Sequence, residues 1–258
     1  MEPKTDFREK YRPRKFAEVL GNELPKRYLI NMIDKRKAPN GLLFDGPPGT
    51  GKTSLAYLTV LGLNCRNFAG DVCGECEACK YFWSHYQSIN RDFAYYDCSK
   101  IGTDRLQEIL QHNINYCSGN KVGRHISLFD EFHRVPERLQ DKFLTRLERD
   151  PELFMFSLID ISAVEDAFKQ RVTILNTSRP EMGEIIPWLA NICTEEGISV
   201  EEGALSILAQ DADMLERACL ATLETISTLQ LPLTSALVRK LSISKKGPEN
   251  QQKRYTQF

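Results

Sequence analysis

One stretch of the sequence has the residue types and the spacing of a phosphate-binding loop. It matches the pattern G-x-x-x-x-G-K-[ST] at every fixed position and reads Gly46-Pro47-Pro48-Gly49-Thr50-Gly51-Lys52-Thr53. Glycines let the backbone wrap closely around a phosphate, so that several N–H groups point inward at the start of a helix. Lys52 would reach the β- and γ-phosphates, the Thr53 hydroxyl would bind Mg²⁺, and Ser54 would follow in the same site. The stretch predicts that the chain binds a nucleoside triphosphate.

An acidic pair, Asp130-Glu131, directly follows the apolar run at residues 125–129. Hydrolysis of a Mg²⁺-bound triphosphate needs one acidic group near the metal and another that orients or deprotonates the attacking water. Asp130 suits the first role and Glu131 the second, because both would lie at the end of a buried strand. His133 could have either a structural or a functional role.

Four cysteines with metal-ligand spacing form a third candidate site. They follow the pattern C-x₇-C-x₂-C-x₂-C and are Cys65, Cys73, Cys76 and Cys79. Zinc prefers four thiolates in a tetrahedron, and such a closed site is structural rather than catalytic. An iron–sulfur cluster uses similar spacing and the absence of any metal is a third reading, but nothing nearby suggests electron transfer, so zinc is favoured. The other four cysteines lack ligand spacing and are expected to be ordinary buried residues: Cys98, Cys117, Cys193 and Cys219.

Five apolar runs predict the strands that position these groups, and helix-forming stretches lie between them. The runs are residues 42–44, 93–97, 125–129, 154–159 and 172–175. This alternation predicts an α/β fold with an open, five-stranded, mostly parallel sheet covered on both faces. Ligands of such sheets bind beyond the carboxyl ends of the strands, and the phosphate loop lies at one such end.

After Arg179-Pro180 the strand pattern stops and helices follow one another. We expect a capping box at residues 199–202 to open one helix, and Thr234 to cap the last helix. The predicted domains are a nucleotide-binding domain at 1–178, with a cysteine module at about 64–82, and a helical domain at 179–245. A polar tail is expected at 246–258.

Composition and charge indicate a globular protein without a strong overall charge. The chain has 258 residues, a hydrophobic fraction of 41% and a net charge of −1, so any contact with nucleic acid must be local. No apolar run is long enough to span a bilayer and the N-terminus lacks a signal-peptide core, so a cytoplasmic protein is expected. In a reducing compartment the cysteines are better read as metal ligands than as disulfides.

Four features together resemble AAA+ ATPases of the bacterial clamp-loader type, most closely their gamma/tau subunits. The first is the opening segment Tyr11-Arg12-Pro13 with Phe16 and Val19-Leu20-Gly21. The second is the phosphate loop, which follows this segment at the family's distance. The third is Asp130-Glu131-Phe132-His133, which is similar to the Walker B motif with Phe132 where Val or Ala is usual. The cysteine module is the fourth and the most diagnostic.

The resemblance covers about residues 7–240 and implies a five-stranded AAA+ core with a helical lid. It implies that Tyr11, Arg12, Val19 and Leu20 help to enclose the adenine. It also implies ATP, Mg²⁺ and Zn²⁺ as cofactors, and a site completed by a neighbouring subunit. The implied function is an ATPase subunit that loads a sliding clamp onto primed DNA during replication, with other AAA+ subunits and the clamp as partners.

Several positions depart from the family pattern. The arginine that reaches a neighbour's γ-phosphate lies in a Ser-Arg-Cys triplet in the family, and only Arg171 of that triplet is retained here. Asp160 stands where the family offers Thr or Asn, although Ser162 could substitute for it. Glu216 occupies the position of the lid arginine, with Arg217 one residue later. The family's helical collar would follow the lid, and this sequence ends at Phe258.

Contact with DNA is expected through a segment that resembles the family's tracking element. Lys100 and Arg105 begin the helix after the second strand and could neutralise phosphates, which would make binding salt-dependent and independent of sequence. An exposed basic pair without a DNA role is the alternative.

Three functions remain open on the sequence. One is slow, assembly-dependent ATP hydrolysis coupled to clamp loading. The second is an AAA+ ATPase of another DNA transaction, in a phage or a mobile element. The third is an assembly subunit that binds ATP without hydrolysing it.

Overall fold

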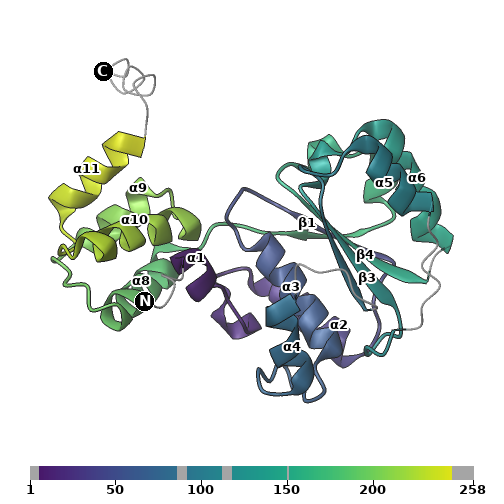
Figure 1. The fold of residues 1–258 in the computed structure, drawn as a ribbon, viewed down its shortest axis with the longest axis horizontal. Coiled ribbons are helices and arrows are strands. Elements are labelled where there is room, and N and C mark those ends of the chain that lie inside the picture. The colour runs from purple at the N-terminus through teal and green to yellow at the C-terminus, as the bar shows by residue number, and fades with distance from the viewer. Residues whose placement is uncertain (1–5, 86–91, 112–117, 150, 246–258) are drawn as a thin grey trace. The chain divides into compact units, whose positions relative to one another are not determined.

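The structure is a computed structural model that describes residues 6–85, 92–111, 118–149 and 151–245 (Figure 1). The chain forms two compact units. One consists of Pro13–Ser178, and the other of Met1–Arg12 together with Arg179–Phe258. Cys117 and the expected polar tail at 246–258 lie outside the described residues. Within the described part, no helix is long and apolar enough to cross a membrane.

The larger unit is built on a five-stranded sheet in which every neighbouring pair is parallel. Its strands are β1 (Gly41–Asp45), β2 (Phe93–Asp97), β3 (His125–Asp130), β4 (Glu152–Leu158) and β5 (Thr173–Asn176). They lie in the order β2-β3-β4-β1-β5, so the chain crosses over the sheet between strands. The predicted α/β fold with a parallel sheet is confirmed.

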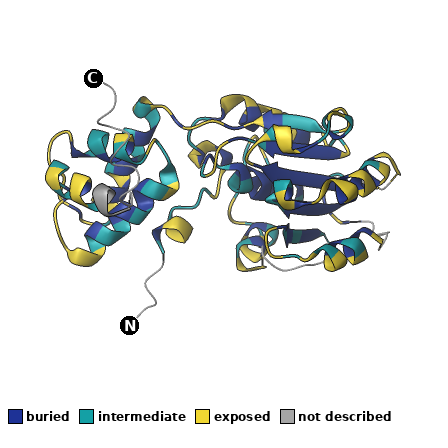
Figure 2. Cartoon of the chain, turned by 90° about the horizontal axis from the view of Figure 1, so that it is seen from above, coloured by how far each residue is buried: buried dark blue, intermediate teal, exposed yellow. Residues whose placement is uncertain are grey.

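Helices cover both faces of this sheet. One face carries α2 (Glu23–Asp34), α3 (Lys52–Asn64) and α4 (Glu77–His85), and the other carries α5 (Thr103–Gln111) and α6 (Glu137–Arg149) (Figure 1). Successive strand residues point to opposite faces, so Leu42 and Phe44 join one core and Leu43 joins the other. The central strands are buried on both sides, which explains their nearly continuous apolar runs (Figure 2).

Short elements lie between the larger ones. η1 (Phe16–Glu18) precedes α2, η2 (Phe132–Arg134) follows β3, and η3 (Ile161–Ala163) and α7 (Asp166–Lys169) lie between β4 and β5. Phe132 is fully buried within a group of phenylalanines that includes Phe143, Phe156 and Phe168. The aromatic side chain at this position therefore fills the core behind the acidic pair.

The smaller unit is all-helical in its described residues. Its helices are α1 (Phe7–Lys10), α8 (Met182–Glu195), α9 (Ala204–Asp211), α10 (Glu216–Leu229) and α11 (Ser235–Lys245). Residues 6–12, which the sequence placed in the nucleotide-binding domain, belong to this helical unit instead. Lys10 Nζ and Tyr11 OH each lie 2.5 Å from Glu196 Oε1, and α1 packs on α10. These contacts hold the first helix on the helical unit.

Helix caps in this unit differ in part from the prediction. The expected capping box at residues 199–202 is wrong, because α9 begins at Ala204 after Gly203 in a left-handed conformation. Val200 instead forms a parallel bridge with Leu233, and the Glu201 carboxylate accepts from Ser235 N. A capping box does occur at α8, where Glu181 and Glu184 cap each other's backbone. Thr234 Oγ1 accepts from Leu237 N at 3.2 Å, as expected for the cap of α11.

Candidate nucleotide site and cysteine cluster

The phosphate loop connects the end of β1 to the start of α3, and its backbone requires glycine. Gly46, Gly49 and Gly51 have φ values of 146°, 80° and 86°. A Cβ on Gly46 would lie 2.3 Å from the Thr177 carbonyl oxygen, so the loop passes directly against the end of β5. Thr50 Oγ1 lies 2.7 Å from Thr177 Oγ1, which fixes the loop to that strand end. No pattern in the sequence points to Thr177, since this contact joins residues 127 positions apart.

Lys52 is the first residue of α3 and is buried inside the loop. Its Nζ donates to the carbonyl oxygens of Gly46 and Pro47, both at 2.7 Å. These contacts hold the ammonium group among the loop's own backbone, next to the N–H groups at the start of α3. A positive charge and a helix N-terminus in one place favour a phosphate group.

Asp130, at the end of β3, faces the loop. Thr53 Oγ1 donates to Asp130 Oδ2 at 3.2 Å, so the two predicted Mg²⁺ ligands lie side by side. Tyr95 OH donates to the same oxygen at 3.2 Å, and Ser157 Oγ donates to Asp130 Oδ1. Burial and the nearby Asp130 charge raise the pKa of Tyr95, which keeps its hydroxyl a donor. Hydroxyl and carboxylate oxygens are the ligands that Mg²⁺ prefers, so this set fits the ion.

Tyr95 and Ser157 were not predicted. They orient the Asp130 carboxylate from the two strands next to β3. A signal for Ser157 exists in the sequence, since it is the one hydroxyl in the run Phe154-Met155-Phe156-Ser157-Leu158. A lone polar residue in a buried strand needs a partner.

Glu131 follows Asp130 in a left-handed conformation with φ of 56°. This conformation is costly for a residue with a side chain and is concentrated at functional sites. His133 Nε2 lies 3.4 Å from Glu131 Oε2, while the Glu131 side chain remains 43% exposed. The carboxylate thus lies next to His133 and is still accessible to solvent, which suits the predicted role of a base that acts on water.

The residues expected near the adenine are divided between the two units. Val19 and Leu20 lie in the larger unit, and a Cβ on Gly51 would be 3.6 Å from Val19 Cγ1. Asn22 Nδ2 donates to Leu20 O at 3.1 Å and to Thr50 O at 3.2 Å, and so joins this segment to the phosphate loop. Asn22 was not predicted. Tyr11 and Arg12 lie in the helical unit, where Arg12 pairs with Glu9, and their role toward a nucleotide stays a prediction.

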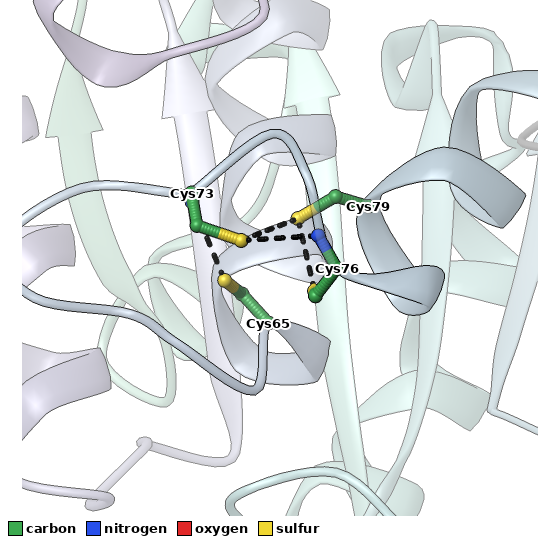
Figure 3. Close-up of side chains that lie close together, drawn as sticks. All are labelled: Cys65, Cys73, Cys76 and Cys79. Atoms are coloured by element: carbon green, nitrogen blue, oxygen red, sulfur yellow. Dashed lines mark hydrogen bonds between the residues drawn. The ribbon is translucent and has the colours of Figure 1, made fainter.

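The four predicted cysteines converge on one point (Figure 3). All four sulfur atoms lie within 4.8 Å of one another, with Cys73–Cys79 at 3.8 Å and Cys76–Cys79 at 3.5 Å. Four sulfurs about 2.3 Å from a tetrahedral zinc ion would be about 3.8 Å apart, so the cluster fits that geometry. The N–H of Cys76 donates to Cys73 Sγ and lowers the pKa of that thiol, which favours the thiolate that binds metals. Cys98, Cys193 and Cys219 are buried, as expected.

A family model described as "DNA polymerase III, delta subunit" matches residues 21–176, which include the loop, the acidic pair and the cysteine cluster. The chain belongs to this family of clamp-loader-type AAA+ proteins. DNA polymerase III subunit gamma/tau of Mycoplasma pneumoniae is 30% identical over 236 residues, which cover 89% of this chain and 33% of the relative. The tau/gamma subunit of Haemophilus influenzae is 34% identical over 213 residues, covering 79% of this chain and 29% of the relative.

Other proteins are similar as well. Protein STICHEL of Arabidopsis thaliana is 30% identical over 239 residues, which cover 91% of this chain and 19% of that protein. The chain thus spans between about a fifth and a third of these three relatives. A solved structure of the RuvB Holliday junction branch migration motor of Thermotoga maritima has the same fold. It matches with a TM-score of 0.62 and 14% identity over 89% of this chain and 71% of that one.

In this clamp-loader-type protein, the positions that depart from the family pattern have partners of their own. Asp160 directly precedes η3 and caps it, because its carboxylate accepts from Ser162 N at 2.8 Å. Its charge, together with burial as the larger cause, raises the pKa of Asp45, the residue before the loop. Arg171 Nε donates to Glu148 Oε1 at 2.6 Å on the surface of the larger unit. Arg217 is exposed in the first turn of α10.

The two predicted DNA contacts are also paired. Lys100 Nζ lies 2.7 Å from Asp97 and Arg105 Nη1 lies 2.7 Å from Glu108, with both basic side chains more than half exposed. Exposed pairs of this kind are weak, so they leave both side chains free to exchange partners. The DNA role of Lys100 and Arg105 stays a prediction.

Proposed function

We propose that the chain binds ATP with Mg²⁺ and hydrolyses it slowly, as a subunit of an assembly that loads a sliding clamp onto primed DNA. The single observation that supports this most is the contact between Thr53 and Asp130 at 3.2 Å. It joins the end of the phosphate loop, which follows β1, to the acidic pair at the end of β3, although β4 lies between these two strands. The similarity to gamma/tau subunits supports the clamp and the DNA as partners.

The proposed chemistry divides among four side chains. Thr53 and Asp130 would hold Mg²⁺, which supplies positive charge to the phosphates when it is bound. Lys52 would neutralise the β- and γ-phosphates. Glu131, oriented by His133, would accept the proton of the attacking water.

Zinc is the metal that we propose for the cysteine cluster. Burial raises the pKa of Cys65 and of Cys79, so a metal ion would displace protons from these two thiols. Because all four positions are sulfur, the site would be closed and its role structural. Metal analysis of the purified chain should give one zinc per chain and no iron.

The two units are proposed to act as an AAA+ nucleotide-binding domain and a lid. Arg171 would leave Glu148 and reach the ATP of a neighbouring subunit in the assembly. Lys100 and Arg105 would contact the DNA backbone. Arg217 would approach the phosphates from the lid, which requires a change in the register of α10.

Measuring ATP turnover with and without sliding clamp and primed DNA tests the proposal. Stimulation by clamp and DNA together supports clamp loading, whereas stimulation by DNA alone supports an ATPase of another DNA transaction. A turnover rate that is high for the isolated chain and unaffected by either addition would contradict assembly-dependent hydrolysis.

A second candidate is an assembly subunit that binds ATP as a conformational ligand. Asp160 favours it, because a carboxylate near the loop disfavours the charge that develops on the γ-phosphate. The absence of turnover in the presence of clamp, DNA and partner subunits, with ATP binding intact, would select this candidate.

A further inference from the structure

We propose that Asp71, inside the cysteine module, is a positioning residue for the adenine side of the nucleotide site. Through Asp71 the metal state of the four cysteines would set the affinity for adenine nucleotides. This inference rests on the proposed binding of ATP. It concerns a residue that touches neither the nucleotide nor the metal.

The Asp71 carboxylate caps the short helix η1 across a long sequence separation. Its Oδ1 accepts from Phe16 N at 2.9 Å and its Oδ2 accepts from Ala17 N at 3.1 Å. These are the first two N–H groups of η1, which have no partner within so short a helix. Oδ1 also accepts from Val72 N at 2.7 Å, which fixes the carboxylate on its own backbone. The carboxylate thus joins two N–H groups of η1 to one N–H group of the module.

Two further contacts join the same segments. The Arg14 guanidinium lies 5.7 Å from the ring centre of Trp83, in α4. Phe16 is 1% exposed and shares one core with Val72 and with the buried Cys65 and Cys79. The segment that begins at Arg14 therefore depends on the cysteine module for its position.

The other end of this segment lies at the phosphate loop. Val19 N donates to Phe16 O at 3.2 Å, so Val19 directly continues η1. Val19 O accepts from Lys26 Nζ at 2.9 Å, and Asn22 links Leu20 to Thr50 in the loop. A shift of η1 would move Val19 and Leu20, while the loop would stay on β5 and α3. Since Val19 and Leu20 are the residues expected near the adenine, a shift of η1 should weaken binding of the base and leave binding of the phosphates unchanged.

Asp71 in turn depends on the cysteines. It lies between Cys65 and Cys73, and Cys73 N donates to Cys65 Sγ at 3.4 Å. Residues 66, 67, 69 and 70 of this loop are exposed, whereas Phe68 packs against the core and its ring centre lies 4.8 Å from Lys121 Nζ. A metal ion bound by both cysteines would fix the loop at its two ends, and with it the carboxylate.

Binding measurements on Asp71→Ala, in the zinc-loaded full chain, test the proposal. Affinity for ATP and for ADP should fall about tenfold, because a charged cap on two helix N–H groups is lost. Affinity for inorganic tripolyphosphate, which lacks the base, should stay within twofold of wild type. Zinc content should remain one per chain. Glu75→Ala, which removes an exposed carboxylate of the same module, should change none of these values.

Chelation of the wild-type metal should reproduce the loss of ATP affinity, and chelation of Asp71→Ala should add nothing further. If Asp71→Ala does not fold, Asp71→Asn keeps one acceptor oxygen and should weaken ATP and ADP two- to threefold, again without effect on tripolyphosphate. Equal affinity for ATP in wild type and variant would overturn the inference, as would an equal loss for tripolyphosphate. A wild-type chain that binds no ATP would overturn the proposed function itself.

Discussion

At the scale of single residues, the site combines a carboxylate held by several hydrogen bonds, Asp130, with a solvent-accessible one, Glu131. Asp130 receives hydrogen bonds from Thr53, Tyr95 and Ser157, which fix its carboxylate from three elements. Glu131 instead has a left-handed backbone and a half-exposed side chain that contacts His133. A metal ligand gains from preorganisation, whereas a base must reach water, and these two environments match those two roles.

Glu131→Gln should separate binding from hydrolysis. The amide cannot accept the proton of water, so turnover should fall by about 100-fold or more. ATP affinity should stay within threefold of wild type, because Lys52, Thr53 and Asp130 are unchanged. Equilibrium binding and single-turnover hydrolysis, measured on the same preparation, check both values. The control is Glu202→Gln, an exposed carboxylate of the helical unit, and a similar rate loss in that variant would contradict the assignment.

Glu216, at the start of α10, should make stability depend on pH. It is partly buried, and loss of solvation raises its pKa to about 7, with Arg217 opposing the shift. The folded chain therefore binds an extra proton, and this contribution to stability is complete below about pH 4.5 and is lost as the pH rises through about 7. Glu216→Gln should raise the free energy of unfolding by about 1–3 kcal/mol at pH 8 and change it little at pH 4. Urea denaturation at the two pH values measures this difference, and an equal effect at both would contradict it.

At the scale of elements, the sequence predicts the five strands because burial on both faces leaves long apolar runs. It misplaces the start of β4 by two residues, since Glu152 is a buried charge within the strand. The residues around Glu152 in the sequence do not show that its partner is Arg146 in α6, whose guanidinium lies 2.7 Å from the Glu152 carboxylate. Pro187 lies inside α8, although proline lacks the N–H group that a helix interior uses.

The candidate site was predicted where its chemistry lies within a short stretch of the sequence. The loop, the acidic pair and the cysteine spacing meet that condition. Asn22, Ser157 and Thr177 act through contacts between distant segments, which depend on the order and register of the strands. Asp71 was missed for the same reason, because its partners in η1 are more than 50 residues away.

Arg146 in α6 and Glu152 in β4 form a buried ion pair. Removing one partner should destabilise the fold more than replacing both. Glu152→Ala leaves Arg146 charged and buried, so the free energy of unfolding should fall by about 3–5 kcal/mol. The double variant Arg146→Met/Glu152→Leu removes both charges and should recover part of that loss, because the buried Ser127 hydroxyl, which donates to Glu152 Oε1, still loses its acceptor. Denaturant unfolding of the wild type, Glu152→Ala and the double variant measures the three free energies of unfolding. A double variant as unstable as Glu152→Ala would show that shape, rather than charge, decides this contact.

At the scale of the whole molecule, the site is expected to be completed by another chain. Arg171 lies on the surface of the larger unit and pairs with Glu148 of the same unit, in contact with solvent. An arginine in that position can exchange its partner for a neighbour's γ-phosphate at low cost, because an exposed ion pair contributes little. Hydrolysis would then require two surfaces, one that carries Glu131 and one that carries Arg171.

Mixing two inactive variants tests this requirement directly. Arg171→Ala should leave ATP affinity unchanged and lower turnover in the assembly by about 10³-fold, because charge developing on the γ-phosphate is no longer stabilised. Glu131→Gln should be inactive because it lacks the group that accepts the proton of water, while its Arg171 is intact. When the two are assembled together, some interfaces join an intact Glu131 to an intact Arg171, so turnover should return to a fraction of the wild-type rate. Co-assembly, verified by mass in solution, without any recovery would show that both residues act within one chain.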